Sequence, residues 1–245
     1  MRIQSKNNGL ILVLFLIIFS AHAQNEQIDQ VLLQLDIPLS RCKEELVAIK
    51  KTPNHPDETI MVIPEIISVD EYHYELSGHV VIVDTETSKI KYRNVESDIT
   101  YTWDSDAVEL NSISIDTAPY MITNEVRAFG IRLGYYAHSR ANPYSKQTLT
   151  LFVKDKESSL RRILNELLIS ESEGEYDGRC ASRYSDTSKI LIMSENTTNG
   201  YNDIISQSTK VDSKTYETQT GDCEEKTISK TKDKQVLKYE HGHYH

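Results

Sequence analysis

Three histidines alternate at the end of the sequence, at His241, His243 and His245. Alternate residues of an extended chain point to the same side, so this spacing lets three imidazoles approach one Zn²⁺ or Cu²⁺ ion. The competing interpretation is a polar tail, because chain ends rarely supply the surrounding hydrogen bonds that orient metal-bound rings. We therefore predict a flexible tail at residues 240–245, with a histidine metal site as the alternative.

A second group of side chains that could bind a ligand consists of arginines and tyrosines in the middle of the chain: Arg127, Arg132, Arg140, Tyr135 and Tyr144. Guanidinium groups donate to anions through a planar fork, and tyrosine rings offer stacking surfaces to sugars. Arg127 and Arg132 are five positions apart, so on a regular strand they point to opposite sides. A shared binding face therefore needs a bulge at Gly130, and the alternative places these arginines on the solvent side of a half-buried strand.

Complete catalytic motifs are absent from the sequence, which has no G-x-S-x-G, H-E-x-x-H, phosphate-binding loop or G-x-G-x-x-G. Pairs such as His79 with Asp84 have acid and base chemistry, but an acid-rich chain supplies such pairs by chance. Residues 195–203 weakly resemble a calcium loop and lack its bidentate glutamate, so a turn with Gly200 at positive φ explains them as well. We predict binding and not catalysis, with an unrecognised hydrolase as the alternative.

The first 23 residues have the pattern of a cleaved export signal. Arg2 and Lys6 precede the apolar run Leu10–Phe19, and Ala21 to Ala23 form an A-x-A cleavage site. The apolar run is about half as long as a membrane span requires, which favours removal over anchoring. We expect an exported protein, periplasmic or secreted, with no transmembrane segment after the signal is removed.

The charge balance is acidic, with 27 basic and 37 acidic residues and a formal net charge of −10. Cleavage after Ala23 would remove Arg2 and Lys6 and no acidic residue, which leaves a net charge of about −12. Nucleic acid is disfavoured as a partner because phosphate contacts require clustered basic side chains. A basic protein ligand is favoured, although charge also serves simple solubility.

Residues 24–245 are expected to form a single β-rich domain. Residues 24–36 have helical spacing within a less regular lead-in at 24–58, and Ser158–Ile169 fits either helix or strand, with strand favoured by the turn before it. Strand patterns recur at 59–69, 79–83, 90–95, 108–115, 127–136, 147–153, 189–193, 203–207 and 235–239. We predict an all-β fold of antiparallel strand–turn–strand units, either a sandwich or a small propeller-like array, with at most one or two short helices.

Three cysteines imply one disulfide and one remaining thiol in an oxidising compartment. All three pairings are possible. We favour Cys180 with Cys223, since both lie in turn-like polar segments where the backbone can adapt to the geometry of a bridge. Cys42 lies among apolar residues and is predicted to be a buried small hydrophobe and not a nucleophile.

Several short motifs resemble an uncharacterised family of exported bacterial proteins: Ile115–Tyr120, Arg127–Arg132, Ser139–Ser145, Glu175–Ala181, Asn199–Tyr201 and Gly221–Cys223. The resemblance implies a bacterial origin and an envelope location, without an activity. The strand–turn–strand units are also similar in architecture to periplasmic β-proteins that bind and inhibit lysozymes. The combined prediction is an exported, non-enzymatic binding protein, with a basic lysozyme-like hydrolase as the suggested partner.

Overall fold

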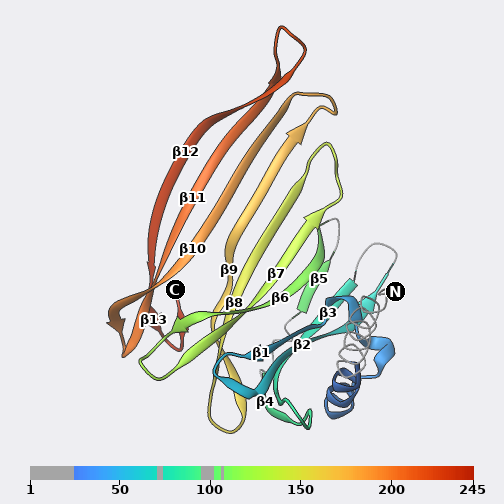
Figure 1. Cartoon of the computed structure of the whole chain (residues 1–245), viewed down its shortest axis with the longest axis vertical. Helices are drawn as coiled ribbons and strands as arrows, with labels where there is room; N and C mark the ends of the chain where they lie inside the picture. Colours follow the sequence, from blue (N-terminus) through green and yellow to red (C-terminus); the bar gives the residue numbers. More distant parts are fainter. Residues whose placement is uncertain (1–24, 71–73, 95–101, 106–107) are drawn as a thin grey trace, which may run out of the picture.

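The computed structural model describes residues 25–70, 74–94, 102–105 and 108–245 of the chain (Figure 1). The predicted export signal therefore lies outside the described residues. Within these ranges, no helix is long and apolar enough to cross a membrane. The described chain begins with a helix over residues 25–35, followed by two 3-10 turns, η1 (Leu39–Arg41) and η2 (Glu44–Leu46).

Strands dominate the rest of the described chain, which confirms the all-β prediction. They are β1 (Ala48–Thr52), β2 (His55–Val69), β3 (Tyr74–Asp84), β4 (Ile90–Asn94), β5 (Thr102–Ser105), β6 (Val108–Met121), β7 (Arg127–Ala137), β8 (Tyr144–Lys154), β9 (Ser159–Tyr176), β10 (Ser182–Thr198), β11 (Tyr201–Glu217), β12 (Cys223–Leu237), β13 (Tyr239–Glu240) and β14 (His243–Tyr244). The ambiguous segment 158–169 is strand from Ser159 onward, as favoured, and forms the first part of β9.

Twelve of these strands belong to one hydrogen-bonded sheet, and β13 and β14 form a separate hairpin. Antiparallel pairing links β1 through β4, and links β6 through β12. The two series meet where Arg93 and Asn94 of β4 pair in parallel with Ser159 and Leu160 of β9. Because β8 occupies one edge of β9, β4 and β10 share its other edge at opposite ends, so β9 joins the two halves of the molecule.

Three apolar clusters hold the body of the molecule together. In the first, residues of β2 and β3 pack against residues of β6, β7 and β8. The second lies on the other face of β7 to β9, beneath the C-terminal hairpin, and the third lies between β2–β3 and the helix at 25–35. Residues 60–63 are all buried because Ile60 and Val62 enter the first cluster while Met61 and Ile63 enter the third. A strand covered on both faces is apolar at every position and does not alternate.

A long extension of the sheet projects beyond these clusters (Figure 1). We define the extension as residues 170–188 of β9 and β10 with residues 208–231 of β11 and β12, which pair across four strands. The edge strand β12 is exposed at almost every position. The extension is therefore held by backbone ladders more than by apolar burial.

The C-terminal residues depart from the prediction of a flexible tail. Residues 239–244 fold back as the β13–β14 hairpin, and Lys238 and His245 exchange two backbone hydrogen bonds of 3.0 Å. Tyr239 and Tyr244 are buried in the second cluster, where the Tyr244 hydroxyl donates to the Asn202 carbonyl oxygen at 2.7 Å. Burial of two tyrosine rings supplies the free energy that orders this segment.

Candidate functional site

The three C-terminal histidines do not converge on a metal position. His241 and Gly242 form the hairpin turn with φ of 51° and 91°, so the alternation expected of an extended chain is lost. The rings of His243 and His245 are 6.5 Å apart, and His245 Nε2 lies 3.1 Å from the Glu240 carbonyl oxygen. Among the described residues, no group of three or more His, Cys, Asp or Glu side chains could hold a metal ion. The hairpin thus departs both from the predicted flexible tail and from its alternative, a histidine metal site.

Arg132 belongs to a hydrogen-bonded network on the face of β7 that carries Ala128. Its Nε and Nη2 donate to Asp116 Oδ2 at 2.9 and 2.6 Å, and its Nη1 donates to Gln147 Oε1 at 2.9 Å. Asp116 also accepts from the Tyr120 hydroxyl and from the Ala118 N–H. The pairing of β6 with β7 shifts register between Asp116 and Tyr120, so this network spans and braces the irregularity.

The pKa of Asp116 shows how burial and hydrogen bonding compete in this network. Burial disfavours the charged carboxylate, but hydrogen bonds from Ala118, Tyr120 and Arg132 outweigh that cost and hold the pKa of Asp116 below its ordinary value. Burial and the bond to Asp116 raise the pKa of Tyr120 to about 12. The guanidinium of Arg132 therefore has a structural role, because it is bonded to Asp116 and Gln147 within the sheet.

Arg127 lies on the opposite face of β7, with Phe129 and Ile131 of the first cluster. Its Nη2 donates to the Thr117 carbonyl oxygen at 2.5 Å. The bulge that would bring Arg127 and Arg132 together is absent, since Gly130 pairs regularly with Asp116 and Leu151. A Cβ on Gly130 would lie 2.5 Å from Leu149 Cδ1, so close packing explains the glycine.

The other members of the predicted arginine and tyrosine group are also separated. Arg140 is exposed in the loop between β7 and β8. The Tyr135 ring lies 4.8 Å from Lys146 Nζ, and the Tyr144 hydroxyl donates to Glu171 at 2.7 Å. Burial and the bond to Glu171 raise the pKa of Tyr144 to about 12. The structure does not assemble one anion- or sugar-binding face from these side chains.

The later sequence motifs form turns. Asp177 Oδ1 accepts from the N–H groups of Arg179 and Cys180 at 2.8 and 3.0 Å, and Gly178 adopts a φ of 83°. Residues 195–203, which weakly resemble a calcium loop, form the end of the β10–β11 hairpin, with Asn199 and Gly200 both at positive φ. Two successive positive-φ residues suit a tight hairpin turn.

The predicted disulfide is present between Cys180 and Cys223, whose Cα atoms are 5.7 Å apart. It links the β9–β10 turn to the start of β12, at the outer end of the extension. Cys42 is free and buried, as predicted. Burial, followed by the charges of Glu44 and Glu45, raises the pKa of its thiol to about 11, which keeps the thiolate population low.

The outer part of the extension carries a concentration of charge. We call residues 171–184 and 214–226 the distal end, which holds eight acidic and four basic side chains. Glu171, Glu173 and Glu175 alternate along β9 and so point to one face. Tyr176 and Tyr216 are exposed there by 37% and 39%. The distal end therefore offers acidic side chains beside accessible aromatic rings.

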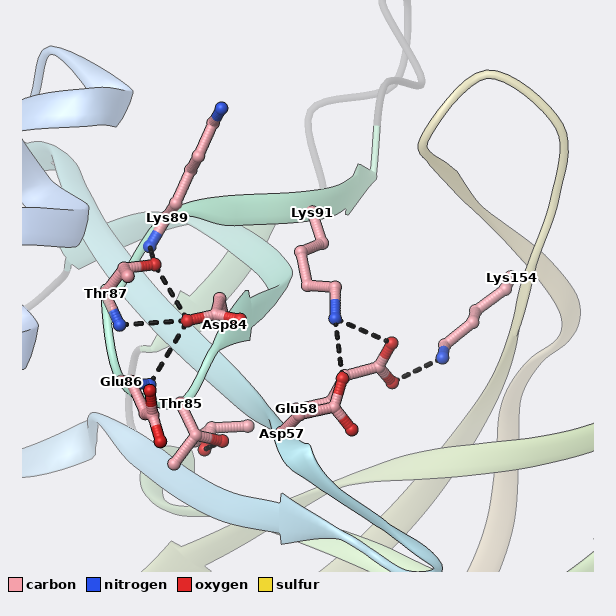
Figure 2. Close-up of polar contacts among 10 residues, drawn as sticks. Asp57, Glu58, Asp84, Thr85, Glu86, Thr87, Lys89, Lys91 and Lys154 are labelled. Carbon is pink, nitrogen blue, oxygen red and sulfur yellow. Dashed lines mark hydrogen bonds and ion pairs between the residues drawn. The ribbon is translucent and has the colours of Figure 1, made fainter.

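A polar cluster lies at the join between β2, β4 and β8 (Figure 2). The buried carboxylate of Glu58 forms ion pairs with Lys154 and, at 3.5 Å, with Lys91. Lys91 also bonds Asp57 at 2.9 Å, and this bond raises the pKa of Lys91. Sequence reasoning missed the cluster because Glu58 and Lys154 are 96 positions apart. The two carboxylates of Glu58 and Asp57 balance the charges of the two lysines, which suits a structural role.

Beside this cluster, Asp84 organises the turn between β3 and β4. Its Oδ1 accepts from the Thr87 N–H at 2.9 Å, the Thr87 hydroxyl at 2.8 Å and the Glu86 N–H at 3.3 Å (Figure 2). His79, which the sequence offers as a chance acid–base partner of Asp84, instead lies with Nε2 2.7 Å from Glu65 Oε2. The His79–Asp84 pair suggested by the sequence is therefore not formed.

No protein-family model matches this chain, and no curated protein or solved structure matches it either.

Proposed function

We propose that this protein is an exported, non-enzymatic binding protein of the bacterial envelope whose distal end binds a basic protein, such as a lysozyme-like hydrolase. The observation that carries the proposal is the twofold excess of acidic over basic side chains at the outer end of a projecting sheet. Complementary charge accelerates encounter with a cationic partner and disfavours anionic ones.

The shape of the extension supports a contact surface. Its four strands expose many side chains, and the Cys180–Cys223 bridge limits how far their ends can separate. A surface that is ordered before binding loses less conformational entropy when the partner docks. Tyr176 and Tyr216 add the kind of accessible aromatic side chain that is enriched at protein interfaces.

Binding is favoured over hydrolysis because the candidate acids and bases form ion pairs with one another or with basic side chains. His79 pairs with Glu65, which also binds Arg41 at 3.0 Å, and Glu58 pairs with two lysines. His138 pairs with Glu109 on the surface at 3.0 Å. These arrangements support ion pairing and give no nucleophile a neighbouring base.

The first experiment measures affinity for a panel of cationic lysozymes by calorimetry at low and high salt. We expect salt-sensitive binding that weakens by about tenfold or more in E173K/E175K. The matched control is E86K/E195K, which changes net charge equally at exposed positions away from the distal end. An equal loss in both variants would show a nonspecific charge effect, and no binding by any lysozyme would eliminate this class of partner.

The bridge provides a second test of the same surface. A C180S/C223S variant should bind the partner more weakly than the wild type, since the strand ends at the distal end are then free to separate. Unchanged affinity would contradict a role of the bridge in ordering the contact surface before binding. Export is tested separately by sequencing the N-terminus of the protein produced in bacteria, where Gln24 should come first.

A further inference from the structure

A cavity of about 400 Å³ opens at one end of the first apolar cluster, where the β1–β2 turn faces the β6–β7 turn. Its apolar wall includes Ile60 of β2, Ile82 of β3 and Phe129 of β7, all members of that cluster. A volume of this size and an apolar wall are typical of small-molecule sites.

Arg127 brings a positive charge to this cavity. One of its nitrogens donates to the Thr117 carbonyl oxygen, and within the described ranges no carboxylate forms an ion pair with it. A guanidinium has five N–H donors, so most of its donor capacity is available to a ligand. Glu125 also lines the cavity, but it is exposed and so screened by water.

The other polar groups of the cavity also favour a ligand that is negatively charged and accepts hydrogen bonds. Lys154 is neutralised by Glu58 and also lies 5.0 Å from the centre of the Tyr92 ring, so Arg127 dominates the local charge. The Thr52 hydroxyl is buried and has no hydrogen-bond partner among the described residues. An unpaired buried hydroxyl is unfavourable, and an acceptor on a ligand would satisfy it.

We propose that this cavity binds an amphipathic carboxylate, with the carboxylate on Arg127 and the Thr52 hydroxyl and with the apolar body against Ile60, Ile82 and Phe129. The ligand replaces water on an apolar wall and supplies the anion that the guanidinium lacks. This site is in the body of the molecule and independent of the distal end, so either proposal can fail without the other.

The test uses decanoate as the probe and decanol as its uncharged counterpart, each titrated into the full mature protein by calorimetry. We expect decanoate to bind more tightly than decanol. R127M should weaken the binding of decanoate by about tenfold or more and leave the binding of decanol almost unchanged, because it removes the charged hydrogen bonds and keeps an unbranched apolar stem. The control R140M alters an exposed arginine outside the cavity and should have no effect.

Location is checked by the NMR signal of the Met121 methyl group, which lines the cavity and should shift on addition of decanoate. T52V keeps the shape of the side chain and removes its hydroxyl, so it should also weaken decanoate binding. It serves as the second variant if R127M does not fold. The proposal is overturned if the wild type does not bind decanoate, if decanol binds equally well, or if the folded variants retain wild-type affinity.

Discussion

The body and the extension of this molecule are built from the same sheet but stabilised differently. In the body, Phe152 and residues 60–63 are fully buried between layers, whereas Ile228 in the extension is 57% exposed. Burial stabilises the body, while the extension relies on strand pairing, a disulfide and a sequence rich in β-branched threonine. The contrast teaches that strands can be long and well paired without a core where ladder hydrogen bonds and a covalent bridge join them.

The largest difference should appear on removal of apolar side chains. Phe152 is fully buried and stacks on Phe129 with ring centres 5.8 Å apart. F152A should lower the free energy of unfolding by about 4 kcal/mol, because it leaves a cavity in the first cluster. I228A, its counterpart in the extension, should change stability by less than about 0.5 kcal/mol. Chemical denaturation measures both, and similar losses would contradict the distinction.

Two tyrosines give the next comparison. Tyr244 is 5% exposed and bonds Asn202, whereas Tyr216 of the extension is 39% exposed and its hydroxyl donates to Glu224 at 3.2 Å. Y244A should cost about 3 kcal/mol, since it removes a buried ring and leaves a carbonyl oxygen unpaired. Y216A should cost much less. Thermal unfolding of both variants checks this, and a harmless Y244A would mean that the C-terminal hairpin does not stabilise the body.

Two aspartates test the electrostatic side of the contrast. The pKa of Asp116 in the body is lowered, so its contribution to stability is fully present above its ordinary pKa of 3.8 and is lost as pH falls through the lower folded value. D116N should cost about 2 kcal/mol at pH 7, because Arg132 and Tyr120 lose a charged partner. The difference from wild type should shrink below about pH 4, as the native carboxylate becomes protonated.

Asp212 of the extension is the matched site. Bonds from Ser229 and Ser185 lower its pKa, but the residue is only half-buried in a sheet without an apolar core, so water screens the interaction. D212N should therefore change stability far less than D116N across the same pH range. Acid titration of unfolding for both variants is the measurement, and equal pH dependence would contradict the assignment.

The smallest effect concerns the cysteines. Cys42 is protected by burial, and the cysteines of the extension are protected by their bond to each other. A thiol reagent should not label the native, oxidised protein. After mild reduction, Cys180 and Cys223 should react first, and Cys42 should react only on unfolding. Early labelling of Cys42, detected by mass spectrometry, would show that the body opens more readily than the extension.

The strands were predictable wherever local pattern decides the outcome. The stretches at 79–83, 127–136 and 147–153 lie within β3, β7 and β8, because side-chain alternation or continuous burial marks a strand in either case. The Cys180–Cys223 pairing, favoured among three possible pairings because both cysteines lie in turn-like segments, is present. The ordered hairpin at residues 240–245 could not be predicted from local pattern, since the burial of Tyr244 depends on β11, about 40 positions earlier.

For the two arginines of the regular strand β7, the sequence by itself determined that they occupy opposite faces, and tertiary structure decided what lies against each of them. The five-residue spacing of Arg127 and Arg132 already indicated opposite faces, as the structure has them. Only the packing of layers placed Asp116 against Arg132, Glu58 against Lys154, and an apolar cavity beside Arg127. The physical reason is range: periodicity is a local property of the chain, whereas these contacts join strands that meet only after the sheet has folded over its core.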